Sequence, residues 1–221
     1  MKPVRLVVAI SGRGRNLEAI IQAVADGRIP AQLAAVVSNR ADAAGLSLAT
    51  AAGVPTIVLP HVAFPDRDGF DLALAAALRG LKPDFVALAG FMRILGADLV
   101  SEFEGRMVNI HPSLLPRHKG LRTHEAALRE GDAEHGATVH FVTPALDDGA
   151  RIIQGRFSVR PEDDAETLAE RTMQEVELKI YPQALAWLAR GDLRLEGALP
   201  KLRGRVLNAP LELADLEEAF L

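Results

Sequence analysis

The sequence of 221 residues contains no cysteine, and this absence excludes three kinds of chemistry. A chain without thiols forms no disulfide, offers no thiolate nucleophile and binds no metal through sulfur. Long apolar runs are also missing from its start, where the stretch 4–10 is too short for a signal peptide or a membrane span. We therefore predict a cytoplasmic protein that does not enter a membrane.

Positive charge is not in excess either. The chain has 25 Lys and Arg residues and 29 Asp and Glu residues, so its net charge is −4 and its isoelectric point is near 5.9. This balance gives no overall basic field for nucleic acid, although a local pair such as Arg13 and Arg15 can bind a small anion. Because 49% of the residues are hydrophobic, the chain can bury the core of an ordinary domain. We expect small-molecule partners and no nucleic acid.

Three well-known site motifs are absent as well. A dinucleotide fingerprint would need a glycine at position 17 and an acidic residue after the second strand, where the chain has Leu17, Ser38 and Asn39. The glycine-rich stretch 11–16 lacks the Lys-Ser/Thr ending of a nucleoside triphosphate loop, and no Gly-x-Ser-x-Gly elbow occurs. The sequence therefore disfavours NAD and gives no sign of a triphosphate site or a serine hydrolase.

What the sequence does contain is an alternation of strands and helices. β-Rich runs cover residues 4–10, 33–37, 55–59, 85–88 and 107–110, and helical patterns begin near residues 16, 42 and 70. Strands that alternate with helices at this spacing are typical of right-handed crossovers, which build a parallel sheet covered on both faces.

The pattern changes in the second half of the chain. Strand-like runs at 138–142 and 152–159 flank the turn-rich stretch 144–149, which predicts an antiparallel hairpin at one sheet edge. We therefore predict an α/β fold: an open, mostly parallel, Rossmann-like twisted sheet with helices on both faces and an antiparallel edge hairpin.

A long helix is expected over residues 163–189, and Pro182 should kink it or split it. The residues that follow read as a peripheral hairpin and a loose acidic end. We divide the chain into one domain, residues 1–192, and a C-terminal hairpin and tail, residues 193–221.

Two polar residues close the apolar run that begins at Met107. Asn109 and His111 stand at the point where a buried strand should end. Side chains two positions apart on a strand share a face, so the amide and the imidazole lie together while Ile110 turns into the core. Such a pair can donate hydrogen bonds to the carbonyl group of a substrate. The alternative is that the two side chains only satisfy each other's hydrogen bonds and have no catalytic role.

The glycine-rich stretch 11–16 predicts an anion site. Glycines let the backbone approach an anion, and free N–H groups at the start of the next helix point toward it. A phosphate would fit there. The alternative is a plain tight turn between strand and helix.

Ligands of open parallel sheets lie beyond the carboxyl ends of the strands. The loops after Ile10, Leu88 and Ile110 are therefore expected around one crevice, and Asp147 could join them if the hairpin turn folds over it. A carboxylate on an imidazole fixes its tautomer and favours its charged form. Asn, His and Asp without metal-ligand spacing suit direct attack of an amine on a carbonyl, so we expect no metal.

Several motifs together resemble the phosphoribosylglycinamide formyltransferases. They are Ile-Ser-Gly-x-Gly-x-Asn at 10–16, Leu-Ala-Gly-Phe-Met-Arg-Ile-Leu at 88–95, Asn-Ile-His-Pro-Ser-Leu-Leu-Pro at 109–116 and Gly-Ala-Thr-Val-His-Phe-Val-Thr at 136–143. The resemblance runs from about Val4 to Trp187. It implies transfer of a formyl group from 10-formyltetrahydrofolate to the glycinamide amine of an early purine intermediate.

The resemblance also implies roles for individual residues. The catalytic set would be Asn109, His111 and Asp147; the ribonucleotide set Gly14, Arg15, Asn16 and Glu177; and the folate set Arg67, Met92, Arg93, Ile94, Leu95 and Asn109. Without the resemblance, we would expect Glu177, on the long helix, to be exposed to solvent. We expect a monomer or a homodimer, although the sequence itself does not reveal the oligomeric state.

Two positions depart from the family pattern. Arg15 replaces a small hydroxyl residue of the phosphate loop, and Pro144 stands where relatives often carry an acid. Rival functions within the same fold are a formyltetrahydrofolate hydrolase and a methionyl-tRNA formyltransferase. Those enzymes usually carry an extra N-terminal and an extra C-terminal domain respectively, and these 221 residues have room for neither. From another class, a silent folate- or nucleotide-binding module stays open.

The charge at position 15 yields a test. We expect Arg15→Ser to weaken ribonucleotide binding and to reduce its salt dependence, because a charged phosphate contact is replaced by a neutral one. Titration of ribonucleotide at several salt concentrations measures both effects. An unchanged salt response would show that Arg15 points elsewhere.

Overall fold

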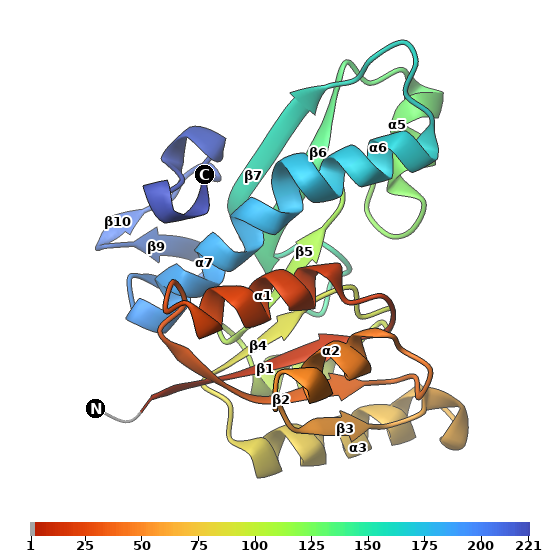
Figure 1. Ribbon diagram of the computed structural model, residues 1–221, viewed down its shortest axis with the longest axis vertical. Helices are drawn as coiled ribbons and strands as arrows, with labels where there is room; N and C mark the ends of the chain where they lie inside the picture. The colour runs from red at the N-terminus through yellow and green to blue at the C-terminus, as the bar shows by residue number, and fades with distance from the viewer. Residues whose placement is uncertain (1–2) are drawn as a thin grey trace. The chain divides into compact units, whose positions relative to one another are not determined.

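The computed structural model describes residues 3–221, whose helices and strands are drawn in Figure 1. It divides into two compact units, one ending at Asn109 and the other beginning at Ile110. Over these residues the strands follow the order β3-β2-β1-β4-β5-β6-β7, and β8, β9 and β10 form a separate antiparallel sheet. The predicted α/β fold with a mostly parallel sheet is confirmed. Within residues 3–221, none of the helices combines the length and apolarity of a membrane span.

Parallel strands make the sheet of the first unit. The strands are β1 (Val4–Ile10), β2 (Ala31–Ser38), β3 (Thr56–Val58), β4 (Phe85–Leu88) and β5 (Met107–His111), and the helices are α1 (Arg15–Ala25), α2 (Gly45–Ala51), the short 3-10 helix η1 (His61–Ala63), α3 (Arg67–Leu81) and α4 (Ala97–Glu102). β1 pairs in parallel with both β2 and β4, and β4 pairs with β5. The inner strands are buried almost throughout, as expected of a parallel sheet covered on both faces.

Helix α3 shows how local sequence sets an element. The Asp66 carboxylate caps its start by accepting a hydrogen bond from the Gly69 N–H at 2.8 Å, and Lys82 ends it in a left-handed conformation. Phe70, Leu74 and Leu78 recur every four residues and form its buried face. The predicted helical pattern near residue 70 is therefore confirmed.

The second unit contains the predicted hairpin. Strands β6 (Glu134–Phe141) and β7 (Arg151–Ser158) pair in antiparallel orientation, and helix α5 (Thr123–Glu130) precedes them. The turn between the strands ends in Gly149, whose position would place a side-chain carbon 1.7 Å from the Phe141 carbonyl oxygen. Only glycine allows this close approach, which fixes the path of the turn that carries Asp147.

The long helix is divided, but not at the predicted place. Its parts are α6 (Ala165–Arg171), the π-helix η2 (Thr172–Glu177) and α7 (Leu178–Arg190), with Pro182 inside α7. A proline ring clashes with the carbonyl four residues before it, which here belongs to Leu178. Leu178 has ψ −10°, away from the usual helical value, so that carbonyl is turned. The strain of Pro182 is therefore relieved upstream, next to the wide π turn.

The end of the chain is not loose, contrary to the sequence-based prediction. It forms β8 (Leu193–Glu196), β9 (Leu199–Leu202), β10 (Arg205–Val206) and two 3-10 turns, η3 (Leu213–Asp215) and η4 (Glu218–Phe220). Leu211 exchanges backbone hydrogen bonds with Ile152 and Gln154 of β7, and Phe220 is buried. The domain boundary at residue 192 stays a prediction.

Glu217 anchors this tail. Its carboxylate accepts hydrogen bonds from the side chains of Trp187, Arg190 and Arg203. Partial burial by itself raises the pKa of Glu217, but these hydrogen bonds outweigh it and lower the pKa to about 2.

The lowered pKa predicts how stability depends on pH. The contribution of Glu217 should be complete above its ordinary pKa of 4.5 and should be lost as the pH falls from there through about 2. We expect Glu217→Gln to lower the unfolding midpoint at pH 7, and the difference from the wild type to shrink on acidification. Thermal unfolding measured from pH 7 to pH 2 tests this, with Glu218→Gln as the exposed control. A difference that is constant with pH would contradict the anchor.

Candidate active site

Strand β5 carries the amide and the imidazole predicted from the sequence. Asn109 is half-buried and lies opposite Leu88 of β4, and His111 is buried with 4% of its surface exposed. The one residue between them places both side chains on the same side of the strand. The arrangement expected for this pair is therefore present.

His111 lies between two oxygen acceptors. Its Nδ1 is 3.4 Å from Oδ2 of Asp147, and its Nε2 is 2.8 Å from the backbone carbonyl oxygen of His118. Both nitrogens can donate at once only when each carries a hydrogen. The two acceptors together fix the orientation of the imidazole ring.

Asp147 reaches the imidazole from the turn after β6. Its backbone has φ +48°, a left-handed conformation that costs energy for a residue with a side chain. The carboxylate also accepts a hydrogen bond from the Gly120 N–H at 2.9 Å, so it joins this turn to the loop before α5. The predicted approach of Asp147 to His111 is found.

A second imidazole faces the same carboxylate. His140 places Nε2 3.8 Å from Oδ1 of Asp147, and its side chain is buried. Burial lowers the pKa of His140, and it lowers the pKa of His135 to about 4. Both side chains are buried, with 1% of His135 and 2% of His140 exposed. Every position of β6 after the first is buried, so the polar residues of this strand have no exposed face.

Glu177 is buried rather than solvated. It ends the π-helix η2 and has 6% of its surface exposed. Burial of Tyr181, and to a lesser extent the charge of Glu177, raises the pKa of Tyr181 well above the usual value. π-Helical turns are rare and occur often at functional sites, because they shift side chains out of the regular helical pattern. The structure thus gives Glu177 the surroundings of a site residue.

In the first unit, Ser11 ties three loops together. Its hydroxyl donates to Oδ1 of Asn39 at 2.5 Å and accepts from the Met92 N–H at 2.7 Å, while its own N–H donates to the Gly90 carbonyl. The loops after β1, β2 and β4 are therefore joined at the carboxyl ends of their strands. Sequence reasoning quoted Ser11 only as part of a glycine-rich stretch and missed this role.

The predicted phosphate loop opens helix α1. Gly14 precedes the helix with φ +83°, and a side-chain carbon there would lie 2.7 Å from the Gly45 Cα atom. Arg15 is the first helical residue and Asn16 is buried. Backbone N–H groups point outward at the N-terminus of a helix, which is the usual basis of an anion site.

The predicted folate segment follows β4. Met92 and Ile94 are exposed although apolar, whereas Leu95 is buried. The Arg93 guanidinium lies 5.7 Å from the centre of the Phe70 ring. An apolar surface of this kind, beside a cation, suits a flat ring with an acidic tail.

Asp71 supports the segment from helix α3, which begins at Arg67. Its carboxylate accepts a hydrogen bond from the Gly96 N–H at 2.6 Å, and burial raises its pKa. Arg67 itself is more than half exposed and lies 3.7 Å from Asp68. The structure thus brings the folate segment close to the Ser11 loop, and places Arg67 on the helix that holds the segment in place.

Comparison with known proteins gives these residues a family. The family model described as formyl transferase matches residues 4–185 of the chain. The chain belongs to the formyl transferase family.

Individual relatives agree with this assignment. The formyl transferase chain is 45% identical to phosphoribosylglycinamide formyltransferase of Escherichia coli over 202 residues, covering 91% of this chain and 95% of the relative. It is 43% identical to the Haemophilus influenzae enzyme of the same name, covering 92% of this chain and 95% of the relative. The solved structure of the Coxiella burnetii phosphoribosylglycinamide formyltransferase superposes with a TM-score of 0.89 at 46% identity, covering 95% of this chain and all of that one.

The contacts of Ser11 predict a cost for its removal from this formyl transferase. We expect Ser11→Ala to lower the free energy of unfolding by about 1–3 kcal/mol, because the buried oxygen of Asn39 and the Met92 N–H both lose their partner. Urea unfolding measures the change. Ser101→Ala, at an exposed helix position, is the matched control and should stay within about 0.5 kcal/mol of the wild type. Equal effects of the two substitutions would contradict the role of Ser11.

Proposed function

We propose that this chain transfers a formyl group from 10-formyltetrahydrofolate to the amine of 5-phosphoribosylglycinamide, a step of de novo purine biosynthesis. The observation that carries the proposal is the setting of His111, which stands two residues from Asn109 and between Asp147 and a backbone carbonyl. An amide, an imidazole and a carboxylate in this arrangement suit acyl transfer to an amine. Family membership and the relatives' shared name support the choice of substrates.

The reaction begins with attack of the substrate amine on the formyl carbon. A carbon–nitrogen bond forms, and the carbonyl electrons move to oxygen. Asn109 and a ring N–H of His111 stabilise that oxyanion, for which one well-placed donor contributes about 3 kcal/mol. The amine loses a proton, which Asp147 helps to relay through water. Collapse of the tetrahedral intermediate then breaks the bond to the folate nitrogen, which takes up a proton.

Binding roles are assigned to the remaining residues. Backbone and side-chain groups of Gly14, Arg15 and Asn16 bind the ribose phosphate, Glu177 contacts the glycinamide, and Arg67 with Met92, Arg93, Ile94, Leu95 and Asn109 lines the folate pocket. Three observations support these roles: the left-handed turn before α1, the burial of Glu177, and the exposed apolar surface at Met92. Positioning of two substrates supplies much of the rate in such a reaction.

A cytoplasmic location, a monomeric or homodimeric state and the absence of a metal stay predictions. The rival reaction is hydrolysis of the formyl folate, in which water replaces the amine. The N-terminus of α1, which suits a phosphate, favours the ribonucleotide as acceptor over water.

One assay separates the candidates. Purified protein is incubated with 10-formyltetrahydrofolate and glycinamide ribonucleotide together, and with each alone, while absorbance follows the loss of the formyl group. We expect turnover only with both substrates. Turnover with the folate alone would indicate a hydrolase, and binding without turnover a silent module.

The same assay tests the imidazole. We expect His111→Ala to reduce kcat by about 10²- to 10⁴-fold, because the oxyanion loses a charged donor. Unchanged thermal unfolding and retained folate binding would show that the variant is folded. Turnover close to that of the wild type would refute the catalytic role of His111.

A further inference from the structure

The contact between His111 and His118 links the active site to a loop that the proposed mechanism does not use. His111 ends strand β5, His118 lies in the segment that joins β5 to α5, and the bond runs from the ring nitrogen of His111 to the main-chain oxygen of His118. At 2.8 Å it is a firm hydrogen bond, whereas the 3.4 Å between Nδ1 and Asp147 is an ion-pair distance. The Nε2–H group is therefore occupied, and Nδ1 is the nitrogen with bonding capacity to spare.

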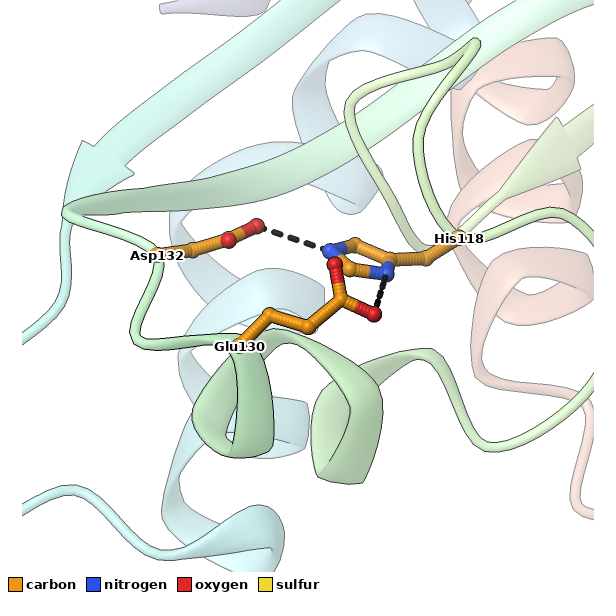
Figure 2. A group of neighbouring side chains, drawn as sticks. All are labelled: His118, Glu130 and Asp132. Carbon is orange, nitrogen blue, oxygen red and sulfur yellow. Dashed lines mark hydrogen bonds and ion pairs between the residues drawn. The ribbon is translucent and has the colours of Figure 1, made fainter.

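The side chain of His118 holds that carbonyl in place. Figure 2 shows its ring between two carboxylates: Nε2 is 2.7 Å from Oδ2 of Asp132, and Nδ1 is 3.8 Å from Oε1 of Glu130. The His118 and Asp132 side chains are each only 5% exposed. Charge-assisted bonds that are this well shielded from water are stronger than those on the surface.

The backbone at His118 needs such an anchor. Its φ is +52°, in the left-handed region that a residue with a side chain adopts only at a cost in energy. A strained conformation of this kind persists when the surroundings fix it. The two ion pairs of the His118 ring provide that constraint.

The cluster in Figure 2 also contains the groups of a metal site, but its charges are already matched. The Arg117 guanidinium bonds to Asp132 and lies 3.5 Å from Glu130. The Arg117 carbonyl accepts a hydrogen bond from the buried Ser113 hydroxyl at 2.7 Å. A cation would have to displace Arg117, so the arrangement is better explained as an anchor for the loop.

We propose that His118 is a positioning residue for the formyl transfer: its backbone carbonyl holds the Nε2–H of His111, and its side chain, fixed by Asp132, holds that carbonyl. The inference rests on the proposed function, and it adds which nitrogen faces the chemistry. Nδ1, beside Asp147, is the nitrogen that donates to the oxyanion and exchanges a proton. No contact of His118 with a substrate is required.

Loss of the anchor should act on the chemical step. A turned imidazole misplaces Nδ1, and a displacement of about 1 Å can reduce the rate of a positioned reaction by 10²-fold. Substrate contacts stay in place, so KM for either substrate should change little. Substitution of a residue that only stabilised the fold would change neither the hydrogen bond of the His111 ring nor kcat in the folded enzyme.

The experiment compares His118→Ala with Asp132→Asn, which keeps an oxygen for the ring and removes its charge. Glu125→Gln, an equal charge change at an exposed position of α5, is the matched control. Full-length proteins are assayed for kcat and for both KM values. In parallel, NMR of 15N-histidine-labelled protein follows the ring N–H of His111, assigned by its disappearance in His111→Ala.

We expect a slowly exchanging His111 Nε2–H signal in the wild type and in the control. His118→Ala should lose the signal and about 10-fold or more in kcat, with KM nearly unchanged, and Asp132→Asn should lose part of each. The inference is overturned if the wild type shows no protected ring N–H, or if Asp132→Asn and any folded His118→Ala protein keep both signal and kcat. A wild type that shows the signal but no formyl transfer would instead reject the proposed function.

Discussion

A buried imidazole with an oxygen acceptor at each nitrogen is the interaction on which the rest of the site depends. Strand β5 decides only where the ring of His111 lies. The two oxygen acceptors of the His111 ring come from irregular segments: the turn that carries Asp147 and the loop that carries the His118 carbonyl. The regular sheet therefore places the reacting group, and the loops decide which of its nitrogens is available.

Both loops are held in backbone conformations that are unfavourable in isolation. His118 and Asp147 have φ +52° and φ +48°, and neither is a glycine. Two different devices maintain them. Ion pairs with Asp132 and Glu130 fix the first, while the close contact of Gly149 with the Phe141 carbonyl fixes the path of the second. Local strain at the site is thus balanced by tertiary contacts around it.

In the first unit, hydrogen bonds hold the loops in place. Ser11 joins the loops that follow β1, β2 and β4, and the close approach of Gly14 to Gly45 leaves no room for a side chain there. Asn39 shows how far a sequence can be interpreted at this point. Because Asn39 is not an acid, the sequence argues against a dinucleotide site. Its role as the acceptor for the Ser11 hydroxyl depends on a loop elsewhere in the chain.

Local patterns in the sequence predict the alternation of strands and helices, the position of Asn109 and His111 on one strand face, and the family. These features depend on local periodicity and on contiguous motifs, which a single chain displays directly. The folded chain was needed to show that His140 faces Asp147, that the helix break lies upstream of Pro182 and that the tail is anchored. The first and third of these features are contacts between segments that are far apart in the sequence, and the second depends on where the helix relieves strain. Local sequence patterns do not encode such features.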